Sequence, residues 1–130
     1  MPYLQIEVNS YYPVETKKQL AKAIGEVYSE IMQASPDRIT VVIRELREGS
    51  VWRCGKEDPV PAAIMMCDIR AGRTKDTREM LSRKLIEVCN ELLGLQVNQL
   101  NIEFTQHSGD EMYHQWMGRF SDDWNADELK

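Results

Sequence analysis

Two stretches of the sequence decide the fold: LAKAIGEVYSEI at residues 20–31 and LSRKLIEVCNEL at residues 81–92, which begin 61 positions apart. In each stretch the apolar side chains are separated by four, three and four positions, the spacing of one buried stripe on an amphipathic helix. An internal repeat is therefore the first organising feature of the chain. It predicts two helices of the same kind, one in each half of the protein.

The same offset also aligns predicted strands on both sides of the helices. Residues 39–43 and 100–104 alternate apolar and polar side chains with the period of a half-buried strand, and residues 2–8 correspond to residues 63–70. Each half thus has the order strand, helix, strand, and a crossover of this type joins parallel strands with right-handed topology. We predict an α/β (α+β) fold, in which two β-α-β units form one four-stranded sheet with both helices on one face.

The predicted layout leaves the other face of the sheet without a covering helix. We expect that face to be apolar, and an exposed apolar face of this size is typical of an interface between subunits. The sequence thus favours an oligomer.

Local signals divide the chain into four segments. The first repeat covers residues 1–58, a linker with Pro59 and Pro61 covers 59–62, the second repeat covers 63–107, and an irregular C-terminal arm covers 108–130. Pro13 is placed to begin the first helix and Thr74 to cap the second, and Gly94 suits a left-handed residue that ends the second helix. Together these segments form a single domain.

Composition narrows the class of protein. The chain has 130 residues, of which 42% are hydrophobic, and 16 basic against 21 acidic side chains give a net charge of −5. An acidic chain does not favour nucleic acid or an anionic membrane surface. The sequence contains no run of about 18 apolar residues, the length needed to span a bilayer. The three cysteines are too far apart in sequence for a disulfide framework or a zinc site. We expect a soluble, cytoplasmic protein with free thiols.

Three short motifs carry a resemblance to a known family: Pro2-Tyr-Leu-Gln-Ile-Glu-Val at the N-terminus, Ala21-Lys-Ala-Ile24, and Arg70-Ala-Gly-Arg73-Thr. With the repeated β-α-β pattern, they resemble the tautomerase superfamily over residues 2–107. The similarity is to the double-length members that include the cis-3-chloroacrylic acid dehalogenases. The resemblance implies a homotrimer that needs neither cofactor nor metal and acts on a small carboxylate substrate.

The resemblance also implies roles for three residues. Pro2, exposed as a secondary amine once Met1 is removed, corresponds to the catalytic base or acid of the family. Arg70 and Arg73 correspond to a pair of arginines that bind the substrate carboxylate, a task that suits the guanidinium group. The alternative for Arg73 is an ion pair with Asp76.

Other positions depart from the family pattern. Tyr28 stands where the dehalogenases have a histidine, and Glu103 stands where they have a tyrosine. Trp52 falls near an aromatic residue that walls the site of the short tautomerases, with trimer packing as the alternative. Thr40 replaces an arginine of the short tautomerases, although Arg38 and Arg44 are close in sequence. The segment 108–120 aligns in two registers, which offer His114 or Trp116 in place of the water-activating carboxylate.

The expected function is that of a cofactor-independent tautomerase, which moves a proton on a carboxylate-bearing enol or 2-keto acid with Pro2. We keep two alternatives open. One is a hydratase or dehalogenase of 3-haloacrylates, or a malonate semialdehyde decarboxylase. The other is a non-catalytic trimeric binding protein with the same fold. His107 and His114 do not have the spacing of a zinc site.

Overall fold

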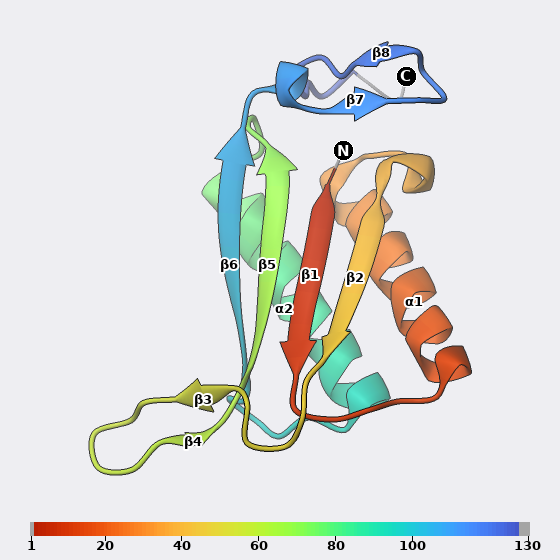
Figure 1. Ribbon diagram of the computed structural model, residues 1–130. Helices are drawn as coiled ribbons and strands as arrows, with labels where there is room; N and C mark the ends of the chain where they lie inside the picture. Colours follow the sequence, from red (N-terminus) through yellow and green to blue (C-terminus); the bar gives the residue numbers. More distant parts are fainter. Residues whose placement is uncertain (1, 128–130) are drawn as a thin grey trace.

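The computed structural model describes residues 2–127, which form one four-stranded sheet and two helices (Figure 1). The strands of the sheet lie in the order β2-β1-β5-β6. They comprise β1 (Tyr3–Val8), β2 (Thr40–Glu45), β5 (Ala63–Arg70) and β6 (Leu100–His107). β1 runs parallel to β2 and β5 runs parallel to β6, while β1 and β5 meet antiparallel. The predicted pair of β-α-β units in one sheet is confirmed.

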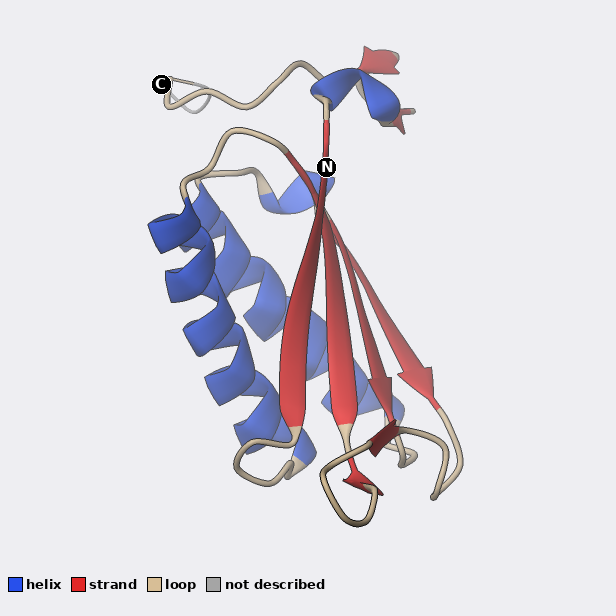
Figure 2. Ribbon diagram, turned by 90° about the vertical axis from the view of Figure 1, so that its left-hand side faces the viewer, coloured by secondary structure: helices blue, strands red, loops and turns tan. Residues whose placement is uncertain are grey.

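Helices α1 (Val14–Met32) and α2 (Lys75–Leu93) are equal in length and keep the 61-residue offset of the repeat. Both cover the same face of the sheet (Figure 2), and their buried stripes begin at Leu20 and Leu81. The Thr74 hydroxyl accepts the backbone N–H of Thr77 at 3.1 Å, and Gly94 ends α2 with φ of 67°. Both predicted caps are confirmed, whereas Pro13 lies one position before the first helical residue.

The core lies between the helices and one side of each strand. Alternate residues of β1 and β5 are almost fully buried there: Leu4, Ile6, Val8, Ala63, Met65, Cys67 and Ile69. Burial raises the pKa of the Cys67 thiol to about 12, so this cysteine is a packing residue and not a nucleophile.

The opposite face of the sheet is not the apolar surface that we expected. Its side chains include Gln5 and Glu7 from β1, Arg44 from β2, Asp68 from β5 and Glu103 from β6. Ile64 and Met66 are apolar, but the flanking strands alternate and present polar side chains on this side. The prediction of an apolar face was wrong because it was made from the absence of a covering helix, whereas the alternation along the strands places polar side chains there.

Additional short elements lie at the two ends of the sheet (Figure 1). The hairpin β3 (Trp52–Arg53) and β4 (Val60–Pro61) extends from one end, so part of the predicted linker is a strand. At the other end, near the start of β1, the chain forms η2 (Gly109–Glu111), β7 (Tyr113–His114) and β8 (Arg119–Phe120). The C-terminal arm therefore contains short regular elements between residues 109 and 120, and its last three residues lie outside the described part. No helix within residues 2–127 is both long and apolar enough to cross a membrane.

Candidate active site

Pro2 lies at the end of the sheet where β1 begins and β5 ends. It is buried, and its carbonyl oxygen accepts the backbone N–H of Thr40 at 3.1 Å, so it stays in register with the start of β2. The antiparallel register pairs Tyr3 with Asp68. Continuing this antiparallel register by one residue places Pro2 opposite Ile69, which precedes Arg70 in β5. Met1 lies outside the described residues.

Arg70 is the last residue of β5 and is only 1% exposed. Its Nη1 donates to the backbone carbonyl of Asp122 at 2.6 Å. A guanidinium is always protonated in proteins, and the Asp122 carbonyl that it bonds carries no charge of its own. Arg70 therefore brings positive charge to the neighbourhood of Pro2 and at the same time holds the C-terminal arm.

Arg73 is also buried, and it contacts the end of α1 and Trp124. Its Nε and Nη2 donate to the carbonyl of Met32, the last residue of α1, at 3.2 and 2.9 Å. Its guanidinium carbon lies 4.5 Å from the centre of the Trp124 ring. These contacts satisfy a helix C-terminus and form a cation–π pair. No ion pair with Asp76 is seen among the described residues, and carboxylate binding by Arg73 stays a prediction.

Residues 108–124, which we call the C-terminal cover, fold back over this end of the sheet (Figures 1 and 2). The backbone N–H of Gly109 donates to Asp123 Oδ1 at 2.7 Å, and the Ser121 N–H donates to the Met112 carbonyl at 3.0 Å. Trp124 Nε1 donates to the Gln33 carbonyl at 3.3 Å. The cover is thus attached to both repeats and encloses the end of the sheet that carries Pro2.

Gly109 is the position at which the cover is most easily tested. A methyl group added there would collide with the backbone carbonyl of Asp122, which is the same carbonyl that Arg70 bonds. We expect Gly109→Ala to loosen the cover and to raise amide hydrogen exchange in residues 109–124 by about tenfold or more, since overpacking costs roughly 1–3 kcal/mol. Gly25→Ala is the matched control because a methyl there meets nothing within 4 Å. Equal exchange in the two variants would contradict the packing of the cover.

His114 is a residue of the C-terminal cover with a titratable side chain. It lies in β7, above the N-terminal end of β1 (Figure 1), and is 9% exposed. Burial, and then the positive charges around it, including Arg38 and Arg70, lower the pKa of its imidazole below the usual value. His114 is therefore neutral at neutral pH.

Arg38 completes the group and was named from the sequence only as a neighbour of Thr40. It ends the short helix η1 (Pro36–Arg38), directly before β2, and is half-buried. Pro2, Arg38, Arg70 and His114 come from four separate segments, and tertiary structure gathers them at one end of the sheet. No spacing rule links them, so a sequence pattern could not have grouped them.

Of three other predicted residues, two lie away from Pro2 within one chain. Tyr28 is completely buried in the core on α1. Trp52 is half exposed on the hairpin at the opposite end of the sheet, where its Nε1 donates to the Gly49 carbonyl at 2.8 Å. Glu103 is exposed in the middle of the open face, opposite Met66. The structure therefore does not bring Trp52 or Glu103 into the group around Pro2, and the substrate-binding roles of Tyr28, Trp52 and Glu103 stay predictions.

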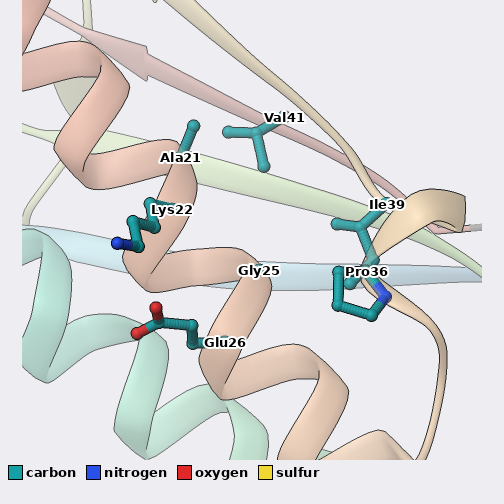
Figure 3. Close-up of a pocket in the computed structure, with 7 residues that line it drawn as sticks. All are labelled: Ala21, Lys22, Gly25, Glu26, Pro36, Ile39 and Val41. Carbon is teal, nitrogen blue, oxygen red and sulfur yellow. The ribbon is translucent and has the colours of Figure 1, made fainter.

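Two surface hollows lie outside this group. A groove of about 390 Å³ runs between α1 and β2, and Figure 3 shows the charged ends of Lys22 and Glu26 pointing away from its apolar residues Ile39 and Val41. A second hollow of about 440 Å³ includes His107, whose Nε2 lies 3.5 Å from Asp68 Oδ1. Among residues 2–127 no three His, Cys, Asp or Glu side chains form a metal-binding group.

The duplicated β-α-β sheet carries Pro2 and two buried arginines, Arg70 and Arg73, at one end. Residues 2–57 match the family described as Tautomerase enzyme. This match covers the first repeat, and the whole chain shares its fold with solved structures of a cis-CaaD family member and of fused 4-OT.

Three of those structures illustrate the likeness. N1, a member of the cis-3-chloroacrylic acid dehalogenase (cis-CaaD) family, is 18% identical, with a TM-score of 0.80 over 93% of this chain and 84% of its own. Pt0534 inactivated by 2-oxo-3-pentynoate is 21% identical, with a TM-score of 0.75 over 91% and 95%. Native fused 4-OT is 15% identical, with a TM-score of 0.75 over 91% and 94%. No curated protein sequence matches the chain.

Proposed function

We propose that the protein is a cofactor-independent tautomerase that moves a proton between carbon and oxygen of a small 2-keto acid or its enol. The observation that carries this proposal is the burial of Pro2 beside Arg70, at the enclosed end of a tautomerase fold. Burial and nearby guanidinium groups favour the neutral amine of a processed N-terminal proline over its ammonium form. A neutral amine is the form that accepts a proton from carbon.

Recognition of the substrate carboxylate is assigned to the positive charges of Arg70 and Arg38. A guanidinium inside a poorly hydrated site binds a carboxylate more strongly than the same group on the surface does. Arg73 is the second arginine of the motif, and its Nε and Nη2 both donate to Met32. We therefore assign Arg73 chiefly to holding α1 and Trp124 in place beside the site.

We further propose that the protein works as a cytoplasmic homotrimer. Fused 4-OT proteins with this fold are described as trimers. Within residues 2–127, the edge strands β2 and β6 each pair with a neighbouring strand on one side only. Exposed Trp52 on the β3–β4 hairpin would then be available to an adjacent subunit, as would Glu103 on the open face.

A second candidate function is hydration or dehalogenation of a 3-haloacrylate, for which the likeness to a cis-CaaD family member is the specific support. Decarboxylation of malonate semialdehyde is a related possibility. Both need a group that activates water or anchors a second oxygen. A non-catalytic binding protein is the remaining alternative.

Reaction with 2-oxo-3-pentynoate tests the proposal directly. This compound inactivates Pt0534, which has the same fold. An acetylenic ketone adds to a neutral amine, so we expect one adduct per chain, located on Pro2 by peptide mapping. The intact mass of the untreated protein must first lack one methionine residue, because an amide nitrogen at Pro2 has no basicity.

The control for this reaction is the exposed thiol of Cys54, which is replaced by serine so that only the amine remains reactive. A protein that retains Met1, or an adduct found elsewhere in the Cys54→Ser variant, would shift the assignment to the non-catalytic alternative. Turnover of phenylenolpyruvate against 3-haloacrylates then distinguishes the two enzymatic functions.

A further inference from the structure

His114 is a buried polar residue whose outer ring nitrogen has nothing to bond. His114 is more than nine-tenths buried. Its Nε2 is inaccessible to solvent and makes no hydrogen bond within residues 2–127. Buried nitrogens of this kind are normally hydrogen-bonded, and the exceptions occur often at sites where a ligand completes the bond. Ser121 Oγ, in the same C-terminal cover, is also buried and without a partner among these residues.

Positive charge acts on His114. Arg38 from η1 and Arg70 from β5 are the side chains whose positive charges act on its imidazole. The Trp116 ring centre lies 6.0 Å from its own. Both arginines resist protonation of His114, so the ring stays neutral and can donate one hydrogen bond without adding charge.

The attachment of the cover fixes where His114 lies relative to Pro2. Arg70, adjacent to Pro2 in the register of the sheet, bonds the carbonyl of Asp122, which follows β8 directly. β8 pairs with β7, with His114 opposite Arg119. Figures 1 and 2 show this hairpin above the start of β1. His114 therefore belongs to the layer that covers the Pro2 end of the sheet.

From this arrangement we propose that His114 is a second catalytic residue, whose Nε2–H donates a hydrogen bond to the carbonyl oxygen of the bound 2-keto acid. The proposal rests on the proposed function. It assigns His114 to the substrate oxygen, whereas Pro2 acts on the substrate carbon. It requires the tautomer that carries the proton on Nε2, which is inferred from the chemistry.

Each proton is accounted for in this scheme. The amine of Pro2 takes a proton from the carbon next to the ketone, and the pair of electrons of that C–H bond becomes the new C=C bond. The electrons of the C=O double bond move to oxygen, where the negative charge is stabilised by the Nε2–H of His114. The ammonium of Pro2 then gives its proton to that oxygen, so the enol forms and the amine is regenerated. His114 keeps its proton throughout.

The test compares two replacements of His114 in the processed protein. We expect His114→Leu to lower kcat for phenylpyruvate by about 10²-fold with little change in KM, which is the loss measured when one donor to a developing oxyanion is removed. His114→Gln can place an amide N–H near the position of Nε2 and should recover most of kcat. His107→Gln is the matched control, since His107 is the other histidine of the chain and faces Asp68. Circular dichroism confirms that each variant folds.

The possible results separate this proposal from the proposed function. If the parent protein is active and depends on Pro2, but His114→Leu retains full kcat, the role of His114 is overturned and the tautomerase assignment stands. If no 2-keto acid or enol is turned over by the processed parent, both fail together. An imidazole with its proton on Nδ1, observed by ¹⁵N NMR of the folded protein, overturns the role of His114 whatever the activity.

Discussion

Pro2→Ala is expected to lower kcat for enol and 2-keto acid interconversion by about 10³-fold, within the range contributed by a positioned acid or base. Alanine at position 2 still allows removal of Met1, so the variant keeps a terminal amine but loses the ring that fixes its direction. The effect should fall on kcat, because the arginines assigned to the substrate carboxylate are unchanged. The initial rate of change in ultraviolet absorbance of phenylenolpyruvate measures it.

The control for this variant is Pro13→Ala. Pro13 is exposed at the start of α1, so its replacement changes a proline without touching the buried end of β1. We expect the activity of this control to match the parent. If Pro2→Ala were as active as Pro13→Ala, the chemistry would not depend on the N-terminal amine, and the non-catalytic or an unrelated catalytic function would be favoured.

Arg70→Met is expected to lower kcat/KM by about 10²–10³-fold, chiefly through a higher KM. Removing one partner of a buried charge interaction with a ligand costs about 2–5 kcal/mol. Methionine keeps much of the length and volume of the arginine stem, so the cavity is small while the charge and the bond to Asp122 are lost. Steady-state kinetics with phenylpyruvate, together with a thermal melt, separates lost binding from lost folding.

Arg83→Met serves as the comparison for Arg70→Met. The Arg83 side chain is 77% exposed on α2 and pairs with Glu79 at 2.6 Å, an exposed helical pair of little energetic weight. It should leave both kcat and KM unchanged. An Arg70→Met protein that is folded and binds substrate as tightly as Arg83→Met does would remove Arg70 from the carboxylate site.

The fold could be predicted from the sequence more fully than the site could. The repeat at Leu20 and Leu81 predicts two helices, four strands and their pairing, because apolar periodicity depends only on neighbours along the chain. Caps such as Thr74 and Gly94 are local for the same reason. The polar side chains of the open face were misjudged because an uncovered face was expected to be apolar, although the alternating strands place polar residues such as Gln5 and Glu103 on it.

Sequence alone thus determined the duplicated fold and singled out Pro2, Arg70 and Arg73 as residues of interest. Only the tertiary structure decided what the arginines touch: Arg70 holds the carbonyl of Asp122, and Arg73 holds that of Met32. It also gathered Arg38 and His114 at the same end of the sheet. The physical reason is that these contacts join segments far apart in the chain, between which neither periodicity nor spacing carries information. They depend instead on how the C-terminal cover folds back across the sheet.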